Sequence, residues 1–582
     1  MPGPQQNGTE AISAGHVSMM NDVLISQLSP DVLRGVVRTL LGANHTNASL
    51  FTSVTRAYLE AHPPTIPDSS DLFPTPFDAS NITQEPTECL KETLREARIR
   101  FSAHMLGPAL LLLASIPRAM LTSNVFIRDT PGPLRDTLVY AAGDMAQAAQ
   151  ALKESGDRSI GARGALVTLV RDLYYYHQVV QKEQSLRPND NIFNPLERAV
   201  AQTIDTLWFC FPDHSGIPFQ EPEYTKMHNI RRTKKALQTT LLGPIKVPRL
   251  FYGLWQLSSP AWGTSSLEDI TQAMSSLASL GFIAADMADH YADAEILFGN
   301  FRNHIMFPST RPALICATKY CQFAPVPSTE TIDREWVLAR VQERSNRVKG
   351  VVDLLQVHWQ HLSDKRYLDV FVHLVQISQR DPDLLRAVGL CNFDTKTMVE
   401  ICEHLNKTIG QEAGIVSNQV QYSLIDHRPR FGMAQACIKY GVKLVTYGTF
   451  CGGFLSDRWV GMDEPSVYKD GFNTSQRKYL DMIKAWGGWE LFQELLETLK
   501  GIAESHNVSV ANVAARWVLD QPETGVVIIG SRLGVTSHDE ANLKIDSFRL
   551  SDEDMAAIEK ILERSRGRQM FEQIGDCGAE YR

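Results

Sequence analysis

The chain has 582 residues, which is too long for one ordinary domain and predicts two or three compact units. A formal net charge of -9 without a basic tract argues against nucleic acid as the main partner, and nine cysteines without a CxxC pair indicate a reducing compartment. No signal peptide is visible and the most apolar stretch, Met105 to Ile116, is too short to span a bilayer, so the sequence predicts a cytoplasmic protein without a membrane segment.

The first 211 residues predict a disordered start and a helical domain. Residues 1–22 are expected to be disordered, and residues 23–211 to form an all-α domain without the alternation of strands. The first helix signal is clear, because Ser29 can cap a helix with Pro30 in its first turn and Gly42 at its end. Further helical patterns cover residues 47–63, 86–120, 132–154, 162–184 and 196–211. No catalytic or ligand-binding motif is recognisable in this domain, which is a candidate module for binding a protein partner.

Residues 212–240 have the composition of a linker, and a different pattern occupies residues 241–582. Short apolar runs of strand type alternate there with amphipathic helical stretches. The eight runs begin at Leu250, Phe282, Ala313, Val351, Ala387, Gly414, Lys443 and Gly525. Eight such runs with helices between them predict a closed (β/α)8 barrel, that is, a TIM barrel of α/β class behind the helical domain.

Almost every apolar run ends in polar side chains. These are Asp286 and Tyr291, Lys319, His358, Asn392, Asn418 and Gln419, Tyr447, and Ser531 with Arg532. Lys319 alone could cap a barrel rim, and His358 alone is more often a core histidine. Because the carboxyl ends of all barrel strands face one mouth, their joint occurrence predicts a single site.

Four of these side chains suggest proton chemistry at an oxygen atom. The Tyr291 phenol, with an ordinary pKa of about 10, needs a nearby cation to act near neutral pH, and Lys319 could supply one. Asp286 would keep the Lys319 ammonium charged, and a neutral His358 could hold a carbonyl oxygen against the phenol. No side chain delivers a hydride, so a cofactor must do so.

At this point the sequence resembles the aldo-keto reductases, over about residues 241–582. The family's catalytic tetrad matches Asp286, Tyr291, Lys319 and His358 in order and strand position. The resemblance implies NADPH bound across the barrel mouth, and reversible reduction of an aldehyde or ketone with a proton from Tyr291. Neither a GxGxxG motif nor a Walker loop is present, which is consistent with that mode of binding.

The resemblance also implies a set of cofactor contacts. Cys391 and Asn392 match a Ser-Asn pair that grips the nicotinamide amide, although a thiol is the weaker hydrogen-bonding group. The other implied contacts are Gln419 at the amide, Tyr447 against the ring, Gly448 and Gly453 at the pyrophosphate, and Ser531, Arg532 and Asn542 at the adenosine end. Arginine suits a 2′-phosphate, so NADPH is expected rather than NADH.

Three further features surround the expected site. Trp255, Trp262 and Trp359 could wall an apolar substrate pocket, or could equally be core fillers. Residues 457–501 are expected to form a long loop that acts as a lid or a substrate wall. The tail from Met570 to Arg582 is expected to fold back onto the barrel, with no partner evident for Cys577.

Two other functions remain open. The protein could bind the cofactor as a redox sensor or scaffold with slow turnover, using the helical domain for interaction. A metal-dependent barrel hydrolase would need an HxH pair at a strand end, whereas His358 and His361 lie three residues apart. No metal site is therefore predicted.

Overall fold

The computed structural model describes residues 25, 27–43, 45–73, 77, 84–213, 228–230, 237–258, 263, 265–306, 314–410, 414–466 and 472–582. These fall into two compact units. The first takes in the described parts of Met1–His62 and Asp463–Phe472, and contains helices α2 (Pro30–Ala43) and α3 (His45–Ala61). Helix α2 begins directly after Ser29, as the sequence predicts. The second unit holds all other elements.

A bundle of helices opens the second unit. Its helices are α4 (Ser69–Leu72), α5 (Glu88–Ser102), α6 (Leu106–Thr122), α7 (Pro133–Ser155), α8 (Ile160–Leu186) and α9 (Glu197–Cys210). Helix α6 packs on α8 and α7 packs on α9, around one apolar core that runs from Leu72 to Phe211. We refer to residues 69–210 as the helical region.

Two details of the helical region differ from the sequence prediction. The pattern over residues 86–120 is two helices, because His104 adopts a left-handed φ of 58° and separates α5 from α6. The short strands β1 (Ile127–Arg128) and β2 (Ile192–Phe193) pair antiparallel. With only two residues each, they are too short to show a period of two.

Eight parallel strands close into a barrel, which confirms the predicted fold class. In chain order they are β6 (Leu250–Gly253), β7 (Ala284–Asp286), β9 (Ile315–Gln322), β10 (Val352–Trp359), β11 (Leu385–Cys391), β12 (Ile415–Gln421), β13 (Lys443–Tyr447) and β14 (Thr524–Gly530). Each predicted run overlaps one of them. The spatial order is the chain order, and β14 pairs with β6 to close the ring.

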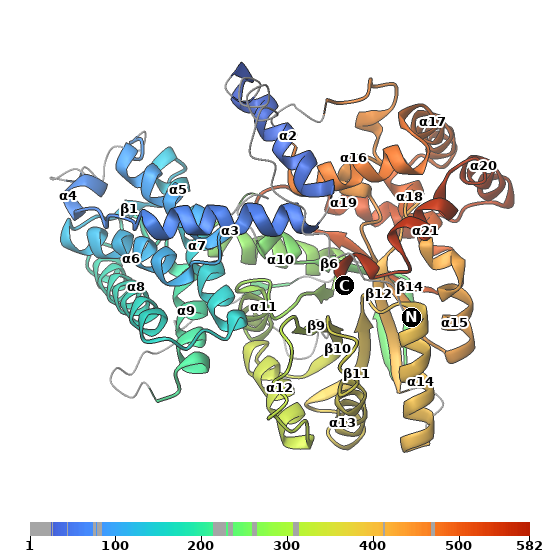
Figure 1. The fold of residues 1–582 in the computed structure, drawn as a ribbon, viewed down its shortest axis with the longest axis horizontal. Helices are drawn as coiled ribbons and strands as arrows, with labels where there is room; N and C mark the ends of the chain where they lie inside the picture. The colour runs from blue at the N-terminus through green and yellow to red at the C-terminus, as the bar shows by residue number, and fades with distance from the viewer. Residues whose placement is uncertain are drawn as a thin grey trace, which may run out of the picture. The chain divides into compact units, whose positions relative to one another are not determined.

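Helices surround the barrel as the alternating pattern requires (Figure 1). They include α10 (Leu267–Leu280), α11 (Ala294–Asn303), α12 (Arg334–Arg347), α13 (Tyr367–Arg380), α14 (Thr395–Ile409), α15 (Met433–Tyr440), α18 (Val510–Leu519) and α20 (Asp552–Leu562). Ser266, Asp333, Asp394 and Ser509 cap four of them by accepting a backbone N–H. Among the described helices, none is both long and apolar enough to cross a membrane.

The amino-terminal end of the barrel is closed by a hairpin. Strands β4 (Thr239–Leu242) and β5 (Ile245–Pro248) pair antiparallel. Leu242, Ile245 and Val247 of the hairpin join the apolar cluster inside the barrel. Functional side chains are therefore confined to the opposite, carboxyl-terminal mouth. Strand β3 (His228–Asn229), within the range expected to be linker, pairs parallel with the short strand β8 (Ile305–Met306) of the barrel domain.

The segment expected to be a long loop, residues 457–501, contains two helices instead. Helix α16 (Thr474–Trp486) begins at a capping box formed by Asn473 and Gln476, and α17 (Trp489–His506) buries one apolar face. The aromatic residues Tyr479, Trp486, Trp489 and Phe492 of these helices are buried. The chain then ends in α19 (Asp539–Leu543), α20, α21 (Gly567–Ile574) and the short turn η7 (Ala579–Tyr581).

Gly299 offers a test of the packing between α11 and α12. A Cβ at this helical position would lie 2.4 Å from the Arg347 carbonyl oxygen, which belongs to backbone that cannot rotate away. We expect Gly299→Ala to lower the free energy of unfolding by about 1–3 kcal/mol, although alanine is the better helix former. Urea unfolding followed by circular dichroism measures this change.

Gly501→Ala is the matched control, because this glycine also lies inside a helix, α17, and a Cβ there would meet nothing within 4 Å. The control is expected to raise stability by up to about 1 kcal/mol. Equal effects of the two substitutions would contradict the close approach of α11 to α12.

Candidate active site

Asp286, Lys319 and Tyr291 meet at the carboxyl-terminal mouth of the barrel. Asp286 ends β7, Lys319 lies on the neighbouring strand β9, and Tyr291 lies in the loop between β7 and α11. Lys319 Nζ lies 2.7 Å from Asp286 Oδ2 and 3.2 Å from the Tyr291 hydroxyl oxygen. All three side chains are buried. The barrel thus brings together residues that lie up to 33 positions apart.

The Lys319 ammonium uses all three of its N–H donors. Besides Asp286 and Tyr291, it donates to the Met287 carbonyl at 2.9 Å. Burial lowers the pKa of Lys319, but the adjacent Asp286 carboxylate and Tyr291 raise it more, so the net pKa lies above the ordinary value. Lys319 is therefore a fixed cation whose three bonds set its orientation.

This arrangement leaves the proton of Tyr291 available. The Tyr291 oxygen accepts a hydrogen bond from Lys319, and because an ammonium accepts no hydrogen bond, the phenol proton is not used in this contact. Burial raises the pKa of the Tyr291 phenol above its ordinary value, while Lys319 acts in the opposite direction. The residue is thus held as a neutral phenol beside a cation, which is the form that can donate a proton.

His358 lies on β10 and supplies a second polar group at the mouth. Its ring contacts those of Phe323 and Tyr581, and its buried Nε2 has no hydrogen-bond partner within the described part of the chain. Burial, with help from the positive charges of Arg582 and Lys319, lowers the pKa of His358 to about 3. The imidazole is therefore neutral near pH 7 and can donate or accept one hydrogen bond.

Gln356 is a site residue that the sequence analysis missed. It lies two residues before His358 on β10 and donates to Asp286 Oδ1 at 3.0 Å. Gln419 of β12 donates to the same oxygen at 2.7 Å and to Gln356 at 3.0 Å. The signal was present, because a glutamine at position i-2 from His358 faces the same side of an otherwise apolar strand.

The residues expected at the nicotinamide are also near one another. The Tyr447 hydroxyl donates to Asn392 Oδ1 at 3.0 Å, and Cys391 Sγ lies 3.9 Å from Gln419 Oε1. Asn392 adopts a left-handed φ of 58°, which turns the chain sharply at the end of β11. Gly448, directly after β13, has a φ of 71° and approaches the Tyr479 hydroxyl, so that a side chain would not fit there.

At the other edge of the mouth, Ser531 and Arg532 follow β14. Both are partly exposed, and the Arg532 guanidinium pairs with no carboxylate among the described residues. Asn542 lies nearby in sequence on α19 and is also partly exposed. Gly453, in the short turn η4 (Cys451–Gly453), has open space where a Cβ would project.

The three tryptophans expected to wall the pocket have different surroundings. Trp255 is 43% exposed in the turn η1 (Trp255–Ser258) after β6. Trp359 is buried, with its ring near Tyr367 of α13 and its Nε1 donating to the His361 carbonyl. Its ring therefore faces the helix layer. Trp262 lies outside the described residues.

The carboxyl-terminal tail returns to the barrel mouth. Arg428 binds Glu580 through both guanidinium Nη atoms, at 2.8 and 3.0 Å. The Tyr581 hydroxyl lies 3.0 Å from that of Tyr447. Arg582 donates to the carbonyl oxygens of Trp359 at 2.8 Å and Asn392 at 2.6 Å. The tail is thus a wall of the site.

Asp289 and His290, just before Tyr291, form a separate polar cluster. With Cys321 they bring three potential ligand atoms within 4.8 Å of one another. Asp289, however, is already bound by the Arg344 guanidinium and by the Cys321 N–H at 3.0 Å. Burial raises the pKa of Asp289, but Arg344, His290 and the Cys321 N–H together lower it more, so the carboxylate is ionised. The cluster ties the loop of Tyr291 to α12 and β9.

Comparison with known proteins identifies the barrel. A family model described as the Aldo/keto reductase family matches residues 249–563, more than half of the chain. Pyridoxal reductase, chloroplastic, from Arabidopsis thaliana is 24% identical over 55% of this chain and 85% of that protein. The aldo-keto reductase YhdN of Bacillus subtilis (strain 168) is 22% identical over 55% of this chain and 92% of its own length.

Another relative matches a shorter stretch. Flagellar radial spoke protein 5 from Chlamydomonas reinhardtii is 32% identical over 146 residues, which are 25% of this chain and 26% of that protein. Among solved structures, the glycerol dehydrogenase of Gluconobacter oxydans aligns over 56% of this chain and 94% of its own, with 20% identity and a TM-score of 0.44.

The neutral state of His358 leads to a prediction on stability. Unfolding exposes the imidazole to water, where its pKa is about 6.5, so below that pH the unfolded chain binds a proton that the folded protein does not. Between pH 7 and pH 4, the wild-type free energy of unfolding should therefore fall by about 3 kcal/mol more than that of His358→Gln. Urea unfolding at several pH values measures the gap, and parallel curves for the two proteins would contradict a depressed pKa.

Proposed function

Because the chain belongs to the aldo/keto reductase family, whose members are oxidoreductases of carbonyl and alcohol groups, we propose that it reduces an aldehyde or ketone with NADPH. Tyr291 is the proton donor of the proposed reaction, which is reversible. Lys319 and Asp286 tune and orient Tyr291, and His358 positions the substrate oxygen. The natural substrate is an aldehyde or ketone that fits beside the tail and the loop after β6.

The observation that carries the proposal is the three-way bonding of Lys319. Its bonds to Asp286, Met287 and Tyr291 leave the Tyr291 O–H as the proton directed to an external acceptor. When that proton is transferred, the phenolate that forms lies 3.2 Å from a permanent cation. Lys319 therefore stabilises the charged product of proton transfer more than the neutral phenol before it.

His358 complements the phenol at the same oxygen. Its Nε2 is buried and has no partner within the described residues, so a substrate oxygen would satisfy it. Because its pKa of about 3 keeps the ring neutral, it orients the carbonyl without competing as an acid. Solvent then returns a proton to Tyr291 and completes the cycle.

The surrounding residues fit a nicotinamide dinucleotide phosphate. Bound at the mouth, NADPH supplies the hydride that reduces the carbonyl carbon. The Arg532 guanidinium, which has no carboxylate partner among the described residues, suits the 2′-phosphate, with Ser531 beside it and Asn542 toward the adenine. Asn392 and Gln419, with Cys391, offer amide and thiol groups for the nicotinamide amide, and Tyr447 offers a ring for its face. Gly448 and Gly453 are the proposed contacts of the pyrophosphate, and the space beside Gly453 is open.

A second candidate function is a cofactor-dependent sensor or scaffold with slow turnover. The helical region lies outside the family match, and one relative is named for the flagellar radial spoke. In this alternative the helical region binds a protein partner. Tight NADPH binding, measured by fluorescence, with no turnover across a panel of aldehydes and ketones would favour it over the reductase.

The proposal predicts a large effect of Tyr291→Phe. Removing the hydroxyl removes the proton donor, so kcat for a reactive aldehyde should fall by about a hundredfold to ten-thousandfold. The Kd of NADPH, measured by fluorescence titration, should change little. Undiminished NADPH oxidation in the variant would refute the role of Tyr291.

Tyr320→Phe is the matched control for this experiment. Tyr320 is the residue after Lys319 on β9, and its hydroxyl contacts Gln322 and Arg340 rather than the tetrad. The same loss of one hydroxyl is expected to leave kcat within about threefold of wild type, because the contacts of this hydroxyl lie outside the catalytic groups.

Cofactor choice can be tested at Arg532. If the guanidinium binds the 2′-phosphate, Arg532→Gln should raise KM for NADPH by about tenfold to a hundredfold, since a charge-assisted hydrogen bond contributes about 1.5–3 kcal/mol. KM for NADH, which lacks that phosphate, should stay within twofold. An equal rise in KM for both cofactors would contradict a role of Arg532 in binding the 2′-phosphate.

A further inference from the structure

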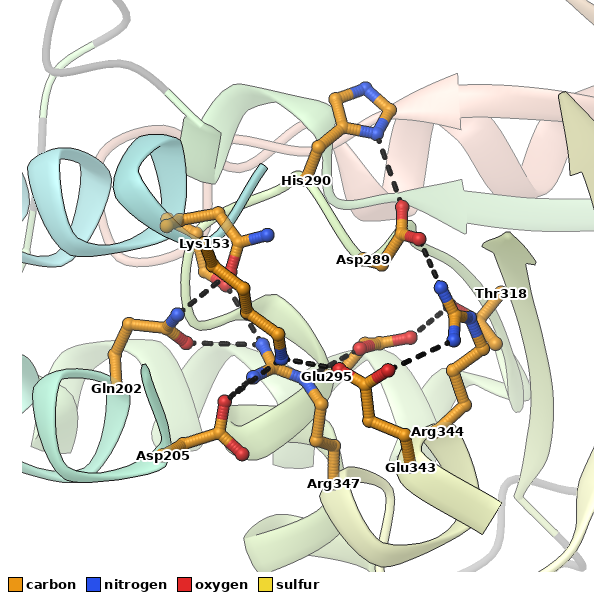
Figure 2. A network of polar contacts seen from close by, with 12 residues as sticks. Lys153, Gln202, Asp205, Asp289, His290, Glu295, Thr318, Glu343, Arg344 and Arg347 are labelled. Atoms are coloured by element: carbon orange, nitrogen blue, oxygen red, sulfur yellow. Dashed lines mark hydrogen bonds and ion pairs between the residues drawn. The ribbon is translucent and has the colours of Figure 1, made fainter. Parts of the chain in front are cut away.

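We propose that the helical region positions the proton donor of the barrel. Arg198 of α9 forms a buried ion pair with Asp293 of loop 287–293, which carries Tyr291. Asp205 of α9 and Lys153 of α7 reach the same loop through Arg347 of α12 (Figure 2). Arg198 is the main positioning residue. The inference rests on the proposed role of Tyr291.

Loop 287–293 needs external support to keep its conformation. The loop connects β7 to α11, and Ala292, directly after Tyr291, adopts a left-handed φ of 49° that residues with a Cβ rarely take. A strained residue of this kind persists only when its surroundings fix it. The contacts that do so lie at Ala292 and Asp293, one and two residues beyond Tyr291.

Arg198 binds the end of this loop directly. Its Nε and Nη2 each lie 2.7 Å from one oxygen of Asp293, so the pair is bidentate. Both side chains are at most 5% exposed. Arg198 Nη2 also donates to the Leu257 carbonyl at 3.2 Å, in the turn after β6. One arginine of α9 therefore joins two neighbouring loops of the barrel mouth.

Arg347 at the end of α12 makes the second connection. Its Nη2 donates to the Ala292 carbonyl at 3.2 Å and to Gln202 of α9 at 3.0 Å. Its Nε donates to Glu295 at 2.7 Å, and its Nη1 binds Asp205. The strained residue and the start of α11 are thus connected to α9 through one buried guanidinium.

Lys153 extends the network to a second helix of the helical region. It pairs with Asp205 at 3.2 Å and with Glu343 of α12. Figure 2 shows Lys153, Gln202 and Asp205 reaching toward Arg347 from one side. On the opposite side, Arg344 binds Asp289 at the start of the same loop. The helical region and the barrel therefore hold opposite ends of loop 287–293.

This placement matters because proton transfer depends steeply on distance. The Tyr291 oxygen must stay within hydrogen-bond reach of both Lys319 and the substrate oxygen. A displacement of about 1 Å in such a group can cost about a hundredfold in rate. Residues of α9 therefore influence the reaction without contacting the substrate.

The test compares Arg198→Gln with the matched control Arg118→Gln in the full-length protein. Arg118 of α6 also binds a buried carboxylate, that of Asp172 on α8, but the pair lies wholly within the helical region. We expect Arg198→Gln to lower kcat by tenfold to a hundredfold with the NADPH Kd within twofold of wild type. Arg118→Gln should leave both values within twofold of wild type.

Two further variants distinguish the positioning of Tyr291 from a general loss of folded structure. Arg198→Lys, which can bind only one oxygen of Asp293, should give an intermediate kcat and remains informative if Arg198→Gln does not fold. In a Tyr291→Phe background, Arg198→Gln should lower the residual rate by less than twofold, because the group that Arg198 positions is already absent. An equal loss in both backgrounds would overturn the proposal.

Hydrogen–deuterium exchange tests the inference independently of any activity. Amides of loop 287–293 should exchange at least tenfold faster in Arg198→Gln than in wild type, and at the wild-type rate in Arg118→Gln. Unchanged exchange and kcat in Arg198→Gln would refute the positioning role even if Tyr291→Phe proves inactive. A wild-type protein without carbonyl reduction would instead refute the proposed function, while the exchange result still decides whether Arg198 fixes the loop.

Discussion

The buried ion pair of Asp286 and Lys319 is the interaction on which the site depends. Both charges lie at the end of an apolar barrel, where an unpaired ammonium would lose its proton. Asp286 can sustain that charge because its second oxygen also accepts hydrogen bonds, from Gln356 and Gln419. Side chains of three other strands, β9, β10 and β12, thus converge on one carboxylate of β7. The proposed donor Tyr291 is coupled to this network through a single bond from Lys319.

Buried ion pairs also fix the loop that carries Tyr291. Loop 287–293 carries no regular structure, yet arginines hold it at both ends: Arg344 at Asp289, and Arg198 at Asp293. Each of these ion pairs is largely buried, so breaking one partner would leave a desolvated charge that costs about 3–5 kcal/mol. A loop fixed by such pairs has few alternative conformations. Through Arg198, the helical region therefore helps to fix the loop that carries the proposed proton donor of the barrel.

Much of this architecture could be predicted from the sequence, for identifiable reasons. Parallel barrel strands are buried on both faces, so each appears as an apolar run, and polar residues at the ends of those runs indicate the mouth. Helices α16 and α17 were not predicted, because their amphipathic pattern lies within residues 457–501, the segment expected to be one long loop. Gln356 was also missed, although its spacing of two from His358 would have shown which side of β10 it faces.

The contacts between the helical region and the barrel could not be predicted. Arg198 and Asp293 are 95 residues apart, and Arg347 and Asp205 are 142 apart. No local period links charges at such separations, and a solvated surface is the default expectation for each of them. The return of Tyr581 to Tyr447 was expected only as a tail that folds back, since its contacts depend on the path of the chain after α20.

Transfer of deuterium from the cofactor to the substrate tests the central claim most directly. NADPH carrying deuterium at C4, prepared as each of the two stereoisomers, would be incubated with the full-length protein and a reactive aldehyde. Mass spectrometry would then locate the label. We expect one stereoisomer to deliver deuterium to the former carbonyl carbon and the other to deliver hydrogen. An alcohol product without deuterium from either isomer, or no alcohol at all, would contradict a carbonyl reductase that uses NADPH as its hydride source.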